Sequence, residues 1–162
     1  MPLTPLHLGI ATCCKAVANH RFSFLIFAGT QVFMDLEPLF GILLKWQTLH
    51  LYTHNLIGAL LIGLISTFLG KPISEWALKK FHYLNWQISW QYALISAFLG
   101  SFSHVFLDAM MHADMFPLFP FSLDNPFLGL VSYSSIFYFC SISFTLGALI
   151  SLLRLTLLSS RN

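Results

Sequence analysis

Long apolar runs, bounded by charged residues, prolines or glycines, make up most of the chain. A helix needs about 20 mostly apolar residues to cross a bilayer. The pattern therefore predicts an all-α, polytopic membrane bundle of about five helices, with four full spans and one short N-terminal helix. The expected helices cover residues 5–18, 22–44, 55–70, 90–111 and 127–153.

Polar residues interrupt or adjoin the first, second and fifth runs. The first run is short and contains Lys15, and the second is interrupted by the segment Asp35-Leu36-Glu37-Pro38. The fifth is preceded by Asp124-Asn125-Pro126, which is typical of a helix cap followed by proline in the first turn. Because the chain has neither an internal repeat nor a low-complexity linker, we expect residues 1–162 to form a single domain.

Composition excludes several classes of protein. Hydrophobic residues make up 57% of the chain and charged residues only 9%, whereas soluble domains carry about 25% charged residues. Composition therefore argues strongly against a water-soluble domain and excludes a disordered chain. A net charge of +2 is too small to indicate a nucleic-acid partner. Cys13, Cys14 and Cys140 are interpreted as small apolar residues, not as a disulfide framework.

The basic residues predict how the helices are oriented. With five helices, seven of the eight basic residues fall on one side of the membrane, and Lys45 is the exception. Basic residues concentrate on the cytoplasmic side, so we expect a cytoplasmic C-terminus and an outward N-terminus that is not a cleaved signal peptide. The seven are Lys15, Arg21, Lys71, Lys79, Lys80, Arg154 and Arg161.

The same topology sends most acidic residues and histidines to the opposite, outer side. At least eight ionisable side chains are expected to converge there, with Asp114 as a further candidate. They are His7, Asp35, Glu37, His50, His54, His104, Asp108 and His112.

The densest polar pattern lies near the end of the fourth run. His104, Asp108 and His112 are spaced four residues apart, so on a helix they share one face. Ionisable groups within a membrane are costly unless they pair or bind a cation. Imidazole with carboxylate suits zinc, iron or manganese. The alternative is a His–Asp hydrogen bond that only joins two helices.

Two further pairs carry candidate chemistry. His50 and His54 repeat the four-residue spacing, and His54 is the better candidate ligand because it directly precedes an apolar run. Their alternative role is that of interfacial histidines. Asp35 and Glu37 are candidate metal ligands or general bases, with helix capping or a salt bridge to Lys45 as the alternative. Asp35 is expected to lie deeper than Glu37.

Four short motifs resemble a known family: Thr4-Pro5-Leu6-His7, Asp35-Leu36-Glu37-Pro38, Thr53-His54 and Ser103-His104-x-x-x-Asp108. They are similar to the small bacterial inner-membrane proteins described as membrane-bound metal-dependent hydrolases, whose usual label comes from a LexA-associated member. The resemblance implies an inner-membrane location, hydrolysis and a metal site of His7, Asp35, His54, His104 and Asp108.

The chain departs from that family pattern in two places. Glu37 stands where the family tends to carry Asp, and the family's Thr- and Gly-containing pattern after the last motif is replaced by Met110-Met111-His112-Ala113-Asp114. His112 and Asp114 are therefore candidate ligands of second rank, as is His50, the less favoured member of the His50/His54 pair.

The leading functional hypothesis is a hydrolase that uses a divalent metal, with zinc first and manganese or iron as alternatives. Its expected substrate is a phosphoester or ester of a membrane lipid or lipid-like molecule at the outer face, with Asp35 or Glu37 as the base. The aromatic, proline-broken segment 115–121 is interpreted as a sideways entrance for such a substrate or as an interfacial anchor. A cation or proton transporter and a non-enzymatic protein with a structural His/Asp cluster are the alternatives.

Overall fold

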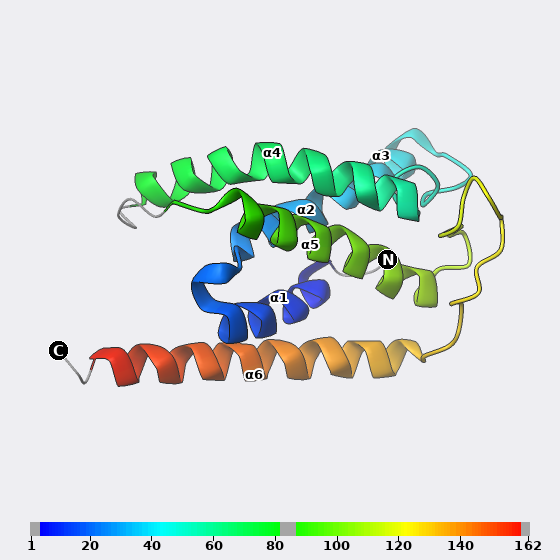
Figure 1. The fold of residues 1–162 in the computed structure, drawn as a ribbon. Helices are drawn as coiled ribbons and strands as arrows, with labels where there is room; N and C mark the ends of the chain where they lie inside the picture. Colours follow the sequence, from blue (N-terminus) through cyan, green and yellow to red (C-terminus); the bar gives the residue numbers. More distant parts are fainter. Residues whose placement is uncertain (1–3, 82–86, 160–162) are drawn as a thin grey trace.

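The fold is an all-α bundle (Figure 1), known from a computed structural model that describes residues 4–81 and 87–159. No β-strand occurs in these two segments, and the predicted fold class is confirmed. The elements are α1 (Thr4–Ala18), a 3₁₀ turn η1 (Asn19–Arg21), α2 (Phe24–Met34), α3 (Leu36–Leu44), α4 (Leu56–Lys80), α5 (Trp90–Met111) and α6 (Tyr133–Ser159).

Four segments are long and apolar enough to cross a membrane. They are Phe24–Leu44, which joins α2 and α3, then Leu56–Lys80, Trp90–Met111 and Tyr133–Arg154. The shorter α1 has 15 residues. This pattern fits a multi-pass membrane protein and confirms the expected four spans with a short N-terminal helix.

Two of the predicted helices have wrong boundaries. Helix α4 continues past residue 70, through Pro72, to Lys80. On this extension Lys71 Nζ lies 2.6 Å from Glu75 Oε1, one turn further on. The three lysines expected in a loop therefore lie on the helix, and the ion pair at this spacing adds a small local stabilisation to the extension.

The other error concerns α6, which begins at Tyr133 and not at residue 127. Asn125 does not cap it. Instead, its side-chain Nδ2 donates to the carbonyl oxygens of Ala109 (2.8 Å) and His112 (3.2 Å), which fastens the loop to the end of α5. Ser132 takes the capping position, and its Oγ accepts from Ser135 N–H at 3.2 Å.

The helices run back and forth, so the bundle has two chemically different ends (Figure 1). The starts of α1, α4 and α6 and the ends of α3 and α5 lie toward one end, on the right in Figure 1, which we call the site end. The ends of α1, α4 and α6 and the start of α5 lie toward the other, which we call the basic end. Lys15, Arg21, Lys71, Lys79, Lys80 and Arg154 belong to the basic end, Lys45 to the site end, and Arg161 lies outside the described residues.

Helix α1 lies beside α6 and brings its first turn to the site end (Figure 1). The crossing is close at Gly9, where an added Cβ would lie 2.1 Å from the carbonyl oxygen of Cys140. Small residues permit such approaches between apolar helices. All three cysteines are free thiols, as predicted, and Cys140 is buried in this contact region.

Helices α2, α4 and α5 pack around an apolar cluster at the site end of the bundle. Met34, Ala59, Val105 and Ala109 are almost fully buried in it. Met34 directly precedes Asp35, and Ala109 directly follows Asp108. The packing of these helices therefore fixes the backbone positions from which the polar side chains project.

Candidate metal centre

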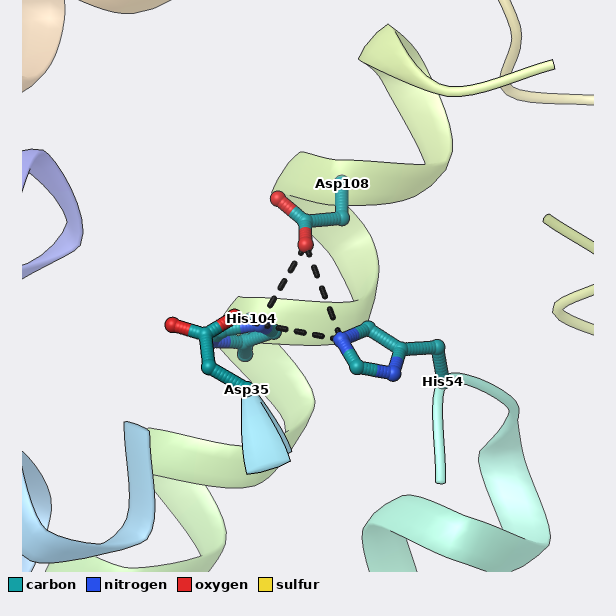
Figure 2. Close-up of side chains that lie close together, drawn as sticks. All are labelled: Asp35, His54, His104 and Asp108. Carbon is teal, nitrogen blue, oxygen red and sulfur yellow. Dashed lines mark hydrogen bonds and ion pairs between the residues drawn. The ribbon is translucent and has the colours of Figure 1, made fainter. Parts of the chain in front are cut away.

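Four side chains from three separate parts of the chain meet at the site end. Asp35 stands at the junction of α2 and α3, His54 in the loop just before α4, and His104 and Asp108 one turn apart on α5 (Figure 2). Each offers one ligand atom, and all four atoms lie within 4.8 Å of one another. Three of these residues are buried, and Asp35 is half-buried.

The centre of the group is Nε2 of His104. It lies 3.2 Å from Oδ2 of Asp108, 3.3 Å from Oδ1 of Asp35 and 3.3 Å from Nε2 of His54. His54 Nε2 is also 3.8 Å from Asp108 Oδ2. Figure 2 shows the resulting triangle of His54, His104 and Asp108, with Asp35 at the side of His104.

Gln31 fixes the orientation of His104. The amide Nε2 of Gln31 donates to the carbonyl oxygen of Gly100 at 3.0 Å, which turns Oε1 toward His104. Nδ1 of His104 is hydrogen-bonded to that oxygen. In neutral His104 the proton therefore lies on Nδ1, and Nε2 presents its lone pair to the centre of the group.

A carboxylate orients His54 in the same manner. Oε2 of Glu37 lies 3.3 Å from Nδ1 of His54. Glu37 also holds the loop that carries this histidine: Oε1 accepts from the N–H groups of Leu51 (3.0 Å) and Tyr52 (2.6 Å), and Oε2 accepts from Thr53 N–H (2.6 Å). Glu37 thus orders residues 51–54 and directs His54 inward.

Burial lowers the pKa of His54 below its usual 6.5, although the hydrogen bond with Glu37 acts in the opposite direction. His54 is accordingly a neutral imidazole at pH 7. Neutral imidazole is the form that binds a metal ion.

The expected depths of the two acidic residues are reversed. Only 5% of the Glu37 side chain is exposed, against 22% for Asp35. Glu37 lies on the inner side of α3 and reaches beneath the loop, whereas Asp35 stands at the helix junction beside a cavity. The position of a residue along an apolar run did not reveal this difference, because it depends on the bend between α2 and α3.

Asp108 gives the clearest indication of what the group requires. Its side chain is fully buried, and neither carboxylate oxygen has a hydrogen-bond partner among the described residues. With both histidines presenting lone pairs, four electron-rich atoms converge without a donor between them. A buried carboxylate is costly without compensation, and either a metal ion or a proton on a neighbouring histidine would compensate it here. Two imidazoles and two carboxylates suit zinc, manganese or iron.

His7 lies against this group but outside the set of four. Its Nε2 is 3.5 Å from Oδ1 of Asp108, and its ring meets that of His104 edge-on, with centroids 4.9 Å apart. Nδ1 of His7 is buried without a hydrogen-bond partner. The structure therefore brings the predicted residue to the cluster, on the Oδ1 side of Asp108.

The three candidates of second rank form a neighbouring arrangement. His50, His112 and Asp108 also offer three ligand atoms within 4.8 Å of one another. Asp114 Oδ2 lies 2.9 Å from His50 Nδ1. Partial burial alone would raise the pKa of Asp114, but the hydrogen bonds from His50 and from Leu49 N–H outweigh it and hold the pKa below its ordinary value.

His112 does not continue the helical stripe as predicted. Helix α5 ends at Met111, and His112 follows it with extended backbone angles (φ −112°, ψ 122°). Its N–H still donates to the Asp108 carbonyl oxygen at 2.8 Å, so the last helical hydrogen bond of α5 keeps His112 near Asp108.

Sequence reasoning missed Gln31 as a site residue. The available signal was a single amide side chain within the apolar run that becomes α2, four residues before Asp35 and hence on the same helical face. Gln31 is fully buried.

A cavity of about 420 Å³ adjoins both groups of ligands. Asp35, His50, His112 and Asp114 form its polar part, and apolar side chains that include Leu39 and Ile42 form the rest. The candidate centre is therefore accessible from one side.

No protein-family model matches the chain, and neither the curated proteins nor the solved structures contain a match. The resemblance to membrane-bound metal-dependent hydrolases thus rests on the four motifs and remains an expectation.

Proposed function

We propose that the protein is a membrane-bound metal-dependent hydrolase that cleaves a phosphoester or ester of a lipid-like substrate at the outer face of a bacterial inner membrane. The supporting observation is the convergence of four ligand atoms, three of them from buried residues. One of the four belongs to the Asp108 carboxylate, whose oxygens have no hydrogen-bond donor among the described residues.

The ion would be held by Nε2 of His54, Nε2 of His104, Asp108 and Asp35. Zinc is the first choice because the donors are imidazole and carboxylate without cysteine, and manganese or iron also fit. A bound divalent ion supplies Lewis acidity and makes water acidic enough to lose a proton near neutral pH.

The four residues differ in how they meet a substrate. Asp35 is the least buried of them and lines the cavity, so it is suited to accept the proton of the attacking water. His54 and His104 are buried, and their Nδ1 atoms are already engaged by Glu37 and Gln31. In this assignment Asp35 is the catalytic base and Glu37 is a positioning residue.

The shape of the cavity supports a lipid-like substrate. Leu39 is 50% exposed and Ile42 39% exposed, and both line the cavity as part of α3. An acyl or prenyl chain is expected to lie along this apolar wall, with the polar end of the molecule toward Asp35. The chain would enter sideways between the bundle and the surrounding lipid.

The distribution of ionisable groups favours a site over a transport path. The histidines and acidic residues that are buried within the described segments are His7, Glu37, His50, His54, His104 and Asp108, and all six lie at the site end. A proton or cation relay would need such groups along the length of the bundle.

Elemental analysis of the detergent-purified protein tests the proposal. We expect near-stoichiometric divalent metal in the wild type and loss of it in His104→Ala. His20→Ala is the matched control, because His20 is exposed at the basic end. Folded wild-type protein that stays metal-free after incubation with zinc, manganese and iron would refute the proposal.

Activity is measured in lipid vesicles with phosphate monoesters and diesters and carboxylic esters that carry long or short chains. We expect hydrolysis that depends on added metal and is stronger for the long chains. Asp35→Asn should abolish it. Cation uptake into the vesicles without hydrolysis would support the transporter instead.

A further inference from the structure

Several ligand-type atoms at the site end remain without a partner once the four-residue group is assigned. Among the described residues, the buried side-chain atoms without a hydrogen bond include Nε2 of His50, Nε2 of His112 and Oδ1 of Asp108. His50 is only 4% exposed. Buried polar atoms are usually hydrogen-bonded, so three such atoms in one place require an explanation.

His50 is oriented as a ligand would be. Its Nδ1 lies 2.9 Å from Asp114 Oδ2, which directs the proton to Nδ1 and leaves Nε2 as a lone pair. The backbone N–H of Leu49 also donates to Asp114 Oδ2 at 3.3 Å. The relation of Asp114 to His50 therefore repeats that of Glu37 to His54, in which a carboxylate holds both the histidine and its loop.

His112 is held from its backbone. Its N–H donates to the carbonyl oxygen of Asp108 at 2.8 Å, and its own carbonyl accepts from the Asn125 side chain at 3.2 Å. The imidazole ring stacks on that of His50, with centroids 4.6 Å apart and an angle of 22° between the planes. These contacts hold the imidazoles of His50 and His112 together near the Asp108 carboxylate.

We propose that His50, His112 and Asp108 form a second divalent-cation site, so that the Asp108 carboxylate bridges two metal ions. The inference rests on the proposed function, because the first ion occupies the group of Asp35, His54, His104 and Asp108. His50, His112 and Asp108 each offer an atom within 4.8 Å of the others.

Within the proposed substrates, the second site favours phosphoesters over carboxylic esters. Paired metal ions, about 3.5–4 Å apart, act together on the attacking and leaving oxygens of phosphoryl groups. The cavity is lined by Asp35 from the first group and by His50 and His112 from the second. A phosphoryl group bound there would meet both ions, while the substrate's chain lies along Leu39 and Ile42.

The test compares metal content in four full-length proteins purified in detergent and loaded with zinc: wild type, His112→Ala, His104→Ala and the His20→Ala control. We expect about two ions per chain in the wild type and the control, and about one in His112→Ala. Retention of the first ion shows that this variant is folded. If His112→Ala fails to fold, His50→Gln, which keeps a polar side chain of similar size, is used in its place.

A second measurement detects the shared carboxylate. In manganese-loaded wild type, the paramagnetic resonance spectrum should show two exchange-coupled ions, and in His112→Ala it should show isolated ions. One ion per chain that is lost in His104→Ala but unchanged in His112→Ala overturns the second site and leaves the proposed hydrolase intact. Absence of metal from the wild type overturns both.

Discussion

Glu37→Gln gives the sharpest test of how the metal centre is built. The substitution keeps the size of a buried side chain but replaces one carboxylate oxygen by an amide NH₂. In the structure both oxygens accept from donors: Oε1 from Leu51 and Tyr52, and Oε2 from Thr53 and His54. Either orientation of the glutamine therefore sets an NH₂ group against buried N–H groups.

The magnitude follows from these contacts. Hydrogen bonds to a charged partner contribute about 1.5–3 kcal/mol each, and a buried donor left unsatisfied costs about 1–3 kcal/mol. Because Thr53 Oγ1 can rotate to accept from the amide, we expect a net loss of about 2–4 kcal/mol in the free energy of unfolding. Metal affinity should fall about 10- to 100-fold, as is usual when the residue that orients a ligating histidine is changed.

The assay is competition for zinc between the detergent-solubilised protein and a chelator of known affinity, together with thermal unfolding of the metal-free protein. Glu75→Gln is the matched control. Glu75 also pairs with a neighbouring group, Lys71, but lies at the basic end, and its substitution should leave metal affinity unchanged.

Two results would contradict this reasoning. Wild-type metal affinity in Glu37→Gln would show that Glu37 does not position His54. Excess zinc should restore hydrolysis in this variant, because its loss is one of metal affinity, whereas Asp35→Asn should stay inactive. If excess zinc fails to restore hydrolysis in folded Glu37→Gln, Glu37 takes part in the reaction itself and is not only a positioning residue.

Three further predictions concern neighbouring positions. Asp108→Asn should abolish metal binding, because it removes the buried anionic ligand that lies between the two histidines of the group; metal content at the wild-type level contradicts the assignment. Gln31→Leu should leave Nδ1–H of His104 unsatisfied, destabilise the protein by about 1–3 kcal/mol and weaken zinc binding in the competition assay. Gly58→Ala should weaken zinc binding in that assay without altering a ligand, because its Cβ would lie 2.5 Å from the Thr53 carbonyl oxygen and displace the loop; wild-type affinity would show that the loop adapts.

The sequence by itself determined the class of fold and the sorting of charge. In a chain with 57% hydrophobic and 9% charged residues, apolar runs long enough to span a bilayer leave few alternatives to a helical bundle. Alternation of the helices then carries most acidic residues and most histidines to one end and most basic residues to the other. The i, i+4 spacing of His104 and Asp108 indicated a shared face before any tertiary contact was known.

Only the tertiary structure decided which polar residues meet and in what role. Spacing along one helix relates His104 to Asp108, but the approach of Asp35 and His54 depends on how α2, the loop before α4 and α5 pack together. The same packing buried Glu37 under a loop, exposed Asp35 to the cavity and made Gln31 part of the site. Hydrogen bonds to the backbone also decided where a helix begins. The Asn125 side chain donates to the Ala109 carbonyl oxygen at the end of α5, so it does not cap α6. Such contacts join residues distant in sequence, and local periodicity carries no information about them.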